Sequence, residues 1–108
     1  MDKQRFTIGP DESIEAALKK IDVNLRRGLI VVENEKAVGT ITDGDIRKAV
    51  LSHRLLITPV RDIMNTNFFR VSVDSSENLE KVFSKKGIFL IPVVDDDMNL
   101  IDIVIRGP

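Results

Sequence analysis

The stretch Gly39-Thr40-Ile41-Thr42-Asp43-Gly44-Asp45-Ile46-Arg47 joins a predicted strand, residues 37–42, to a helix predicted to begin near Asp43. The strand alternates apolar and polar side chains, as a half-buried strand does. The helix has an apolar face formed by Ile46, Ala49 and Val50. Such a junction presents unpaired backbone N–H groups at the positive end of a helix dipole. The stretch is therefore a candidate site for a phosphate or a carboxylate.

Thr42 and Asp45 allow two interpretations of this junction. A hydroxyl and an acceptor-only carboxylate suit a polar ligand. The same spacing is that of a capping box, in which each side chain satisfies the backbone N–H of the other residue. Asp43 and Asp45 also form an Asp-x-Asp pair, but carboxylates at a helix start complement the dipole without a metal. We predict no metal site, and capping and ligand binding both stay open.

Composition excludes several classes of function. The 108 residues carry 16 basic and 17 acidic side chains, so no strong field favours nucleic acid or an anionic membrane. The absence of cysteine excludes disulfides, thiolate metal sites and a cysteine nucleophile. His53 is the only histidine and lies in no catalytic motif, so we expect that the chain is not an enzyme. We expect the His53 side chain to be exposed or to cap a helix. With no signal peptide and no apolar run near about 18 residues, we expect a soluble cytoplasmic protein.

The predicted elements occur twice in the same order. The first set is an extended entry at 6–8, a helix from about 13 to 24, strands at 29–32 and 37–42, and a helix from 43 to about 52. A short helical turn follows Pro59, and then come an extended entry at 69–73, a helix with Leu79, Val82 and Phe83, and strands at 88–94 and 100–105. Asp95-Asp96-Asp97 is predicted to be a hairpin turn. The order indicates an internal repeat.

The repeat predicts an α/β (α+β) fold of two β-α-β-β-α units. Phe6 aligns with Val71 and Gly39 with Asp102, and the second unit lacks its last helix. A three-stranded sheet with helices on one face leaves its other face bare, so the two units should pack sheet to sheet. We place the first unit at residues 1–58 and the linker with the second unit at 59–108.

Three motifs carry a resemblance to a known family. They are the stretch 39–45, the strand Ile91-Pro92-Val93-Val94-Asp95 and the linker Pro59-Val60-Arg61-Asp62-Ile63-Met64. In these motifs the sequence resembles the CBS-domain pair, or Bateman module, over nearly the whole chain. The resemblance implies a regulatory module without catalytic activity. Its expected ligand is AMP, ADP, ATP or another adenosine compound, bound between the repeats, with no required cofactor.

The resemblance also implies partners. The chain looks most similar to CBS pairs attached to sugar-phosphate nucleotidyltransferases, with the catalytic domain C-terminal to the pair. A similar Thr-Asp-Gly-Asp sequence occurs in CBS pairs fused to sugar-phosphate isomerases. We therefore expect a fragment of a larger enzyme and a homodimer formed through the CBS modules. The alternative is a dimerisation or interaction module that binds no ligand.

The family's site can be transferred to matching positions of this chain. Asp45 would accept hydrogen bonds from the ribose hydroxyls, and Thr42 would contact the phosphate or the ribose. The adenine would lie against the opposite repeat, at Asn65, Thr66, Phe68, Phe69, Ile88, Phe89, Leu90 and Pro92. The phenylalanines have a simpler alternative, because aromatic side chains most often form the core.

The second repeat departs from the family pattern. Ile105 stands where threonine is expected, and Pro108 stands where aspartate is expected. We therefore predict one adenosine site in the chain. Arg47 and Lys48, in the first turns of the helix after the junction, could reach a phosphate or remain solvated.

Overall fold

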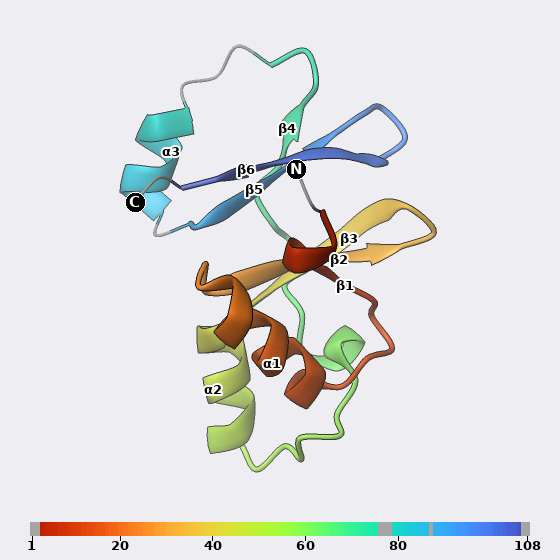
Figure 1. Ribbon diagram of the computed structural model, residues 1–108, viewed down its shortest axis with the longest axis vertical. Helices are drawn as coiled ribbons and strands as arrows, with labels where there is room; N and C mark the ends of the chain where they lie inside the picture. Colours follow the sequence, from red (N-terminus) through yellow and green to blue (C-terminus); the bar gives the residue numbers. More distant parts are fainter. Residues whose placement is uncertain (1–2, 76–78, 87, 107–108) are drawn as a thin grey trace.

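The computed structural model describes residues 3–75, 79–86 and 88–106. Its elements come in two sets (Figure 1). The first set is η1 (Lys3–Phe6), β1 (Thr7–Ile8), α1 (Ile14–Asn24), β2 (Gly28–Glu33), β3 (Lys36–Thr42) and α2 (Asp43–Leu51). After the short helix η2 (Val60–Asp62), the second set is β4 (Val71–Ser72), α3 (Leu79–Lys86), β5 (Leu90–Val94) and β6 (Leu100–Ile105). The predicted order of elements is confirmed.

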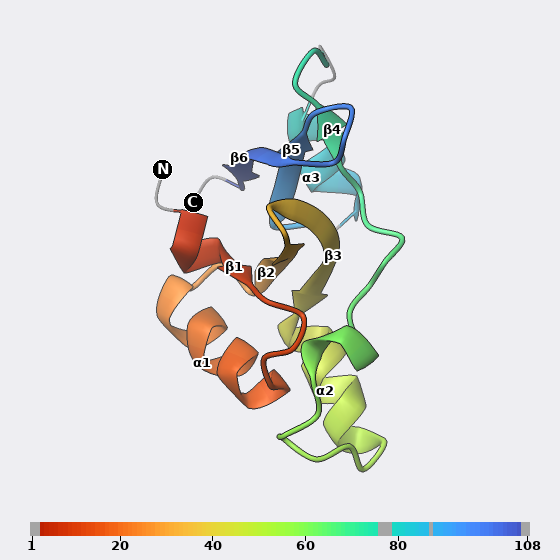
Figure 2. The ribbon, with the colours of Figure 1, turned by 90° about the vertical axis from the view of Figure 1, so that its right-hand side faces the viewer.

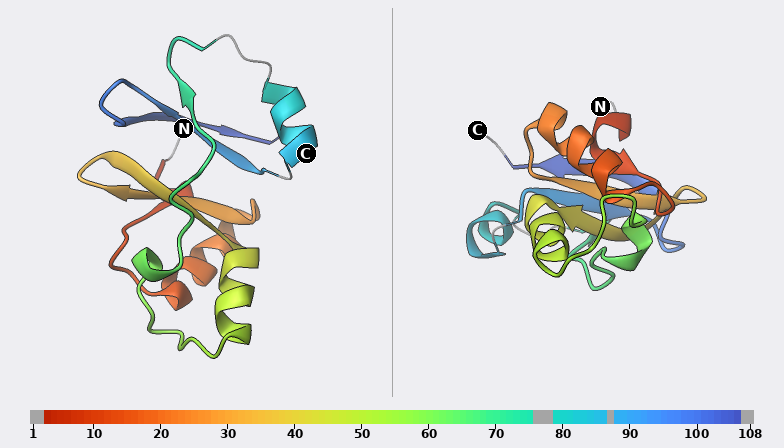
Figure 3. Two further views of the ribbon diagram at one scale, coloured as in Figure 1. Left: turned by 180° about the vertical axis from the view of Figure 1, so that it is seen from behind. Right: turned by 90° about the horizontal axis from the view of Figure 1, so that it is seen from below.

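Two three-stranded sheets lie face to face in the middle of the molecule (Figures 1 and 3). In each sheet the first strand pairs in parallel with the second, which pairs antiparallel with the third. A buried cluster joins the two inner faces and consists of Phe6, Ile30, Ala37, Phe68, Leu90, Val94 and Ile103. We call this set the inter-sheet core. The predicted sheet-to-sheet packing of a tandem repeat is confirmed.

The β-bulges of the two sheets show how the repeats correspond. In the first sheet the register shifts directly after the pair Val31–Gly39. In the second sheet it shifts directly after the pair Val93–Asp102. A bulge changes which residues of a strand point into the core, so equivalent bulges mark equivalent positions. The predicted correspondence of Gly39 with Asp102 is confirmed.

The predicted alignment of the first strands was wrong. Val71 pairs with Val93 in the second sheet, whereas Ile8 pairs with Val31 in the first. Val71 is therefore the counterpart of Ile8, not of Phe6. The entry strands are only two residues long, so neither offers a periodic pattern that would determine its register.

Helices α1 and α2 cover the outer face of the first sheet (Figure 1). The hydroxyl of Ser13 caps α1 by accepting a hydrogen bond from the backbone N–H of Ala16 at 3.1 Å. The helix ends at Asn24, and its C-cap residue Leu25 has a left-handed φ of 59°. On the second sheet, Phe83 of α3 packs against Val71 and Ile91. The first sheet is thus covered by α1 and α2, and the second by α3, each on the face away from the other sheet.

The linker after α2 packs on the first repeat before it crosses to the second. The backbone N–H of Val60 donates to the carbonyl of Glu12 at 2.8 Å, and the Val60 side chain is fully buried. Thr40 and Asn65 exchange backbone hydrogen bonds of 3.0 and 2.8 Å, which add the linker to the edge of β3. Figure 2 shows the linker passing beside β3 on its way to β4. This contact brings residues 65–69 to the space between the sheets.

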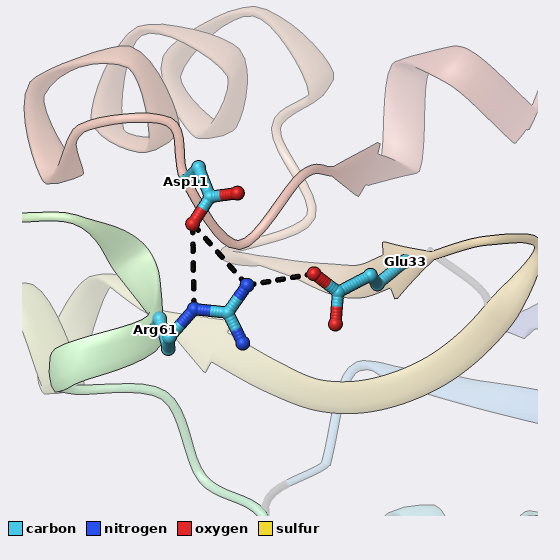
Figure 4. A network of polar contacts seen from close by, with 3 residues as sticks. All are labelled: Asp11, Glu33 and Arg61. Atoms are coloured by element: carbon cyan, nitrogen blue, oxygen red, sulfur yellow. Dashed lines mark hydrogen bonds and ion pairs between the residues drawn. The ribbon is translucent and has the colours of Figure 1, made fainter.

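Arg61 ties the linker to two other segments (Figure 4). Its Nη2 donates to Oε2 of Glu33 at 2.7 Å and to Oδ1 of Asp11 at 3.2 Å. The hydrogen bond to Glu33, followed by that to Asp11, raises the pKa of Arg61. Because all three side chains are exposed, solvent screens this network, and it positions the linker more than it stabilises the fold.

Asp95 organises the hairpin between β5 and β6. Its carboxylate accepts hydrogen bonds from the side-chain amide of Asn99 at 3.1 Å and from the backbone N–H groups of Asp97 and Asn99, both at 2.9 Å. The hydrogen bond from the Asn99 side chain is the main cause that lowers the pKa of Asp95. The predicted hairpin turn is confirmed.

We expect Gly39→Ala to destabilise the protein. A β-carbon at this position would lie 2.8 Å from Sδ of Met64 and 3.1 Å from the backbone carbonyl oxygen of Asn65. Overpacking of this kind costs about 1–3 kcal/mol. Urea denaturation of both proteins would measure the loss. Gly44→Ala is the matched control, because its β-carbon would make only ordinary contacts at 3.6 Å; equal losses in the two variants would contradict the argument.

Candidate ligand cavity between the sheets

A cavity of about 530 Å³ opens between the two repeats. Its walls come from the start of β2, the end of β3, the linker and the residues before β5. The lining residues are Gly28, Leu29, Ile30, Thr40, Ile41, Thr42, Asp45, Asn65, Asn67, Phe68, Phe69, Ile88, Phe89 and Leu90. The cavity is therefore bounded by the start of β2 and the end of β3 in the first sheet, by the linker, and by the residues that lead into β5 in the second sheet.

One end of the cavity is polar. The hydroxyl of Thr42 accepts from the backbone N–H of Asp45 at 3.1 Å, and Oδ2 of Asp45 accepts from the backbone N–H of Thr42 at 2.9 Å. These reciprocal bonds are the predicted capping box of α2. In the described part of the chain, no hydrogen bond reaches Oδ1 of Asp45. The carboxylate can therefore cap the helix with one oxygen and accept hydrogen bonds from a ligand with the other.

The opposite wall is apolar and comes from the second repeat and the linker. Phe68 is buried in the inter-sheet core and still contributes to the cavity wall. Phe69 and Phe89 are half-buried lining residues. A slot with aromatic and aliphatic walls and one polar end has the composition of a small-molecule site.

Eight of the ten residues predicted for the site line this cavity: Thr42, Asp45, Asn65, Phe68, Phe69, Ile88, Phe89 and Leu90. Thr66 is exposed and does not line it. Pro92 also lies outside the lining; it sits in the middle of β5, where it pairs with Ile103. The strand predicted at 88–94 begins at Leu90, so Ile88 and Phe89 reach the cavity from a non-strand segment.

The prediction missed the β2 side of the cavity. Gly28 pairs with Thr42, and Ile30 pairs with Thr40, so the beginning of β2 lies beside the end of β3. The predicted hairpin contained this signal, since antiparallel pairing places the start of one strand next to the end of the other. Asn67, in the linker, was also missed.

Other candidate residues lie outside the cavity wall. Arg47 and Lys48 are exposed, and His53 is exposed beyond the end of α2, as predicted. Asp43 pairs with Arg27, with 3.4 Å between Oδ2 and Nε. Within residues 3–75, 79–86 and 88–106, no group of three or more His, Cys, Asp or Glu side chains could hold a metal ion.

The second repeat has an apolar residue at the position of Thr42. Leu90 pairs with Ile105 as Gly28 pairs with Thr42. Ile105 packs against the inter-sheet core. Pro108, predicted to replace the aspartate, lies outside the described residues. At Ile105 the second repeat therefore lacks the hydroxyl group that Thr42 supplies in the first repeat.

A comparison with family models identifies both repeats. The model of the CBS domain matches residues 1–52 and 60–107. The fold agrees with this match, because each matched segment contains one of the two sheets. The chain belongs to the CBS-domain family as a tandem pair of CBS domains.

Curated relatives cover almost the whole chain. The chain is 31% identical over 105 residues to an inosine-5'-monophosphate dehydrogenase of Methanocaldococcus jannaschii. The matched region is 94% of this chain and 20% of that enzyme. It is 34% identical over 103 residues to an uncharacterised protein of Methanopyrus kandleri and spans 53% of that protein. A CBS domain-containing protein of Dictyostelium discoideum is 32% identical, with 99% of this chain and 83% of the relative covered. The chain thus spans a fifth to about half of the first two relatives.

Solved structures share the fold. One is the CBS domain pair of an M. jannaschii protein in complex with 5'-methylthioadenosine and S-adenosyl-L-methionine. It is 31% identical to this chain, with a TM-score of 0.73, and the match covers 93% of this chain and 83% of that chain. A second M. jannaschii protein, described as an archaeal homologue of the γ subunit of AMPK, has a TM-score of 0.79 at 27% identity over 97% of this chain and 44% of that chain. A Pyrobaculum aerophilum CBS protein complexed with AMP is 16% identical with a TM-score of 0.75, over 93% of this chain and 79% of that chain, and shows the fold alone.

The helices are short. Across the described ranges, none of them combines the length and the apolar composition needed to span a membrane.

Proposed function

We propose that this CBS pair is a regulatory module that binds one adenosine compound in the cavity between its repeats. The observation that carries the proposal is that Thr42 and Asp45 line the same cavity as Phe68, Phe69 and Phe89. The cavity volume of about 530 Å³ lies in the range of small-molecule sites. Occupancy of the cavity would bridge the two repeats and so transmit a signal to an associated enzyme.

The polar and the aromatic residues of the cavity lining match the two parts of a nucleoside, the ribose and the base. The vicinal hydroxyls of a ribose suit the free oxygen of the Asp45 carboxylate, since an ionised carboxylate is an acceptor only. A purine is flat and apolar on its faces, which suits a slot between Phe69, Phe89 and the aliphatic residues around them. The backbone groups of Asn65 and Thr40 are paired with each other, so the polar edge of the base would meet other groups of the linker.

The related structures support an adenosine ligand. The 31% identical CBS pair holds 5'-methylthioadenosine and S-adenosyl-L-methionine, two compounds that share an adenosine. This relative covers most of both chains, so its ligand class is a reasonable guide to the class bound here. AMP, ADP and ATP belong to the same class.

The identity of the regulated enzyme is a separate proposal. The sequence predicts attachment to a sugar-phosphate nucleotidyltransferase, whereas the enzyme among the relatives reported above is an inosine-5'-monophosphate dehydrogenase. The relative favours a link to a nucleotide-metabolising enzyme. Attachment to a nucleotidyltransferase, homodimer formation and a cytoplasmic location stay predictions.

A ligand-free interaction module is the second candidate function. It is favoured by the apolar residues at the end of α2 and just after it, where Leu51, Leu55 and Ile57 are 73%, 68% and 78% exposed. An exposed apolar patch of this kind marks many interaction surfaces. The two functions differ in one respect that can be measured, which is whether the cavity takes a ligand.

Thermal unfolding in the presence of nucleotides would test the proposal. We expect at least one of AMP, ADP, ATP, 5'-methylthioadenosine and S-adenosyl-L-methionine to raise the melting temperature in a saturable way. A ligand at one hundred times its Kd stabilises the folded state by about 2.7 kcal/mol. Ribose 5-phosphate, which lacks the base, is the control and should give no shift. If no adenosine compound stabilises the protein, the interaction module is the better function.

A further inference from the structure

A second hollow lies on the surface of the first repeat, between η1 and α1, which run side by side in Figures 1 and 2. It has a volume of about 520 Å³ and is open to solvent. Its lining residues are Gln4, Arg5, Lys19, Lys20 and Val23, and none of them lines the cavity between the sheets. We call this hollow the η1–α1 groove. Its lining contains three cationic side chains and no acidic one.

Side-chain hydrogen bonds hold the two walls of the groove together. Nζ of Lys20 donates to the carbonyls of Gln4 at 2.8 Å and of Thr7 at 2.7 Å. Nδ2 of Asn24, a buried residue, donates to the carbonyl of Arg5 at 3.0 Å. These bonds tie α1 to η1 and to the first residue of β1. The groove is therefore formed in advance, which lowers the cost of binding a partner.

Acidic side chains do not neutralise the positive charge of the groove. In the described part of the chain, no carboxylate forms an ion pair with Arg5, Lys19 or Lys20. Glu15 and Asp22 stand four residues before and three residues after Lys19 on α1, the spacing of helical ion pairs, yet neither pairs with it. The groove thus has a local positive charge in a chain whose net charge is −1, and it attracts an acidic partner.

Val23 adds an apolar contact beside these charges. Its side chain is 70% exposed. Lys19 and Lys20 precede it by four and three residues on α1, so both lysines are its neighbours on the helix surface. The groove therefore offers an apolar side chain flanked by cations. Its complement is an apolar side chain flanked by carboxylates, which an acidic protein segment supplies and a free phosphate does not.

A nucleic acid fits the groove less well than an acidic protein segment. The affinity of a protein for nucleic acid rises with the number of phosphates that its cations neutralise. The groove has only three cations, and Lys20 already donates to two carbonyls.

We propose that the η1–α1 groove docks an acidic segment of a partner protein, with carboxylates bound at Arg5 and Lys19 and an apolar side chain at Val23. The inference goes beyond the proposed function, because the groove lies outside the ligand cavity and docking needs no adenosine compound. The guanidinium group of Arg5 can hold a carboxylate through two parallel hydrogen bonds. The ammonium group of Lys20 keeps one N–H for the same segment.

Fluorescence anisotropy of a labelled peptide would test the inference. The probe is Glu-Glu-Leu-Glu-Glu, titrated with the protein at low salt and without any adenosine compound. We expect saturable binding that weakens as salt rises. Arg5→Gln and Lys19→Gln should each weaken binding about threefold, the effect of losing one exposed ion pair, and the double variant about tenfold. Val23→Ser should weaken it about threefold through the lost apolar contact.

Two variants on α2 are the matched controls. Lys48→Gln removes the charge of an exposed helical lysine that does not line the groove. Val50→Ser removes an apolar side chain that is 46% exposed and also lies outside the groove. Both variants should bind the peptide as the parent protein does. The peptide Gln-Gln-Leu-Gln-Gln should not bind, and the melting temperature of each variant would verify that it is folded.

Several outcomes would overturn the inference. One is that the parent protein does not bind the acidic peptide at low salt, and another is that Lys48→Gln loses as much affinity as Lys19→Gln. Pyrophosphate that displaces the probe at a lower concentration than the unlabelled peptide would assign the groove to a small anion. Tighter binding of a short oligothymidylate, lost in Lys19→Gln, would assign it to nucleic acid. Self-association of the parent that is lost in Lys19→Gln would assign it to a second copy of the chain.

These results are independent of the proposed function. The peptide experiment contains no adenosine compound, and the thermal unfolding experiment contains no peptide. Failure of one therefore leaves the other standing.

Discussion

Ile103→Ala is expected to lower the free energy of unfolding by about 2–5 kcal/mol, the usual loss when a fully buried isoleucine becomes alanine. Ile103 is 1% exposed and belongs to the inter-sheet core. This core holds the two repeats together, so the cavity left behind weakens both. Since a small domain is stable by only about 5–15 kcal/mol, the loss is a large fraction of the total. Urea denaturation followed by circular dichroism would measure it.

Ile101→Ala is the control for this prediction. Ile101 is the same residue type on the same strand but is 46% exposed, because it is the extra residue of the β6 bulge between the partners of Val93 and Val94. Its truncation should cost about 0.5 kcal/mol, as at other surface positions. Similar losses in the two variants would mean that the contact between the sheets does not determine stability.

Asp45→Asn is expected to weaken adenosine binding at least tenfold, because a hydrogen bond to a charged group contributes about 1.5–3 kcal/mol. The asparagine oxygen can still accept from the backbone N–H of Thr42, which Oδ2 of Asp45 does at 2.9 Å. The capping box is therefore largely kept, and the melting temperature without ligand should change little. Titration calorimetry with adenosine, which has no phosphate, would isolate the ribose contact.

Two further variants make the Asp45 experiment decisive. Asp22→Asn removes a carboxylate from an exposed position of α1, and adenosine affinity should not change. Asp45→Ala removes both the cap and the ligand contact, so it should also cost about 1 kcal/mol of stability. Unchanged adenosine affinity in Asp45→Asn would restrict Asp45 to capping and place the ligand elsewhere.

Much of the candidate site was predictable because its residues belong to local motifs. The capping box between Thr42 and Asp45 depends on three residues of spacing, and it is present, as one of the two interpretations of this stretch predicted. The repeat of apolar segments predicted two sheets packed together, since each sheet had one uncovered apolar face. The family resemblance then indicated most of the cavity wall, including Phe68, Phe69 and Phe89.

The errors occurred where local patterns carry little information. The two-residue entry strands have no periodicity, so Val71 was aligned with Phe6 instead of Ile8. Pro92 was included in the site on the strength of a motif, whereas Ile88, Phe89 and Leu90 line the cavity and Pro92 lies further along β5, paired with Ile103. In both cases strand pairing, which no single segment encodes, determined the outcome.

The sequence by itself determined the order of the elements, the tandem repeat and the cap at Thr42 and Asp45, because these depend on neighbours within a few residues. Only the tertiary structure decided which side chains face the cavity. Arg27 and Arg106 are far apart in the sequence and belong to no motif, yet both lie over Phe89. Their meeting requires the register of two sheets and the packing of one against the other, so this contact is a property of the folded chain.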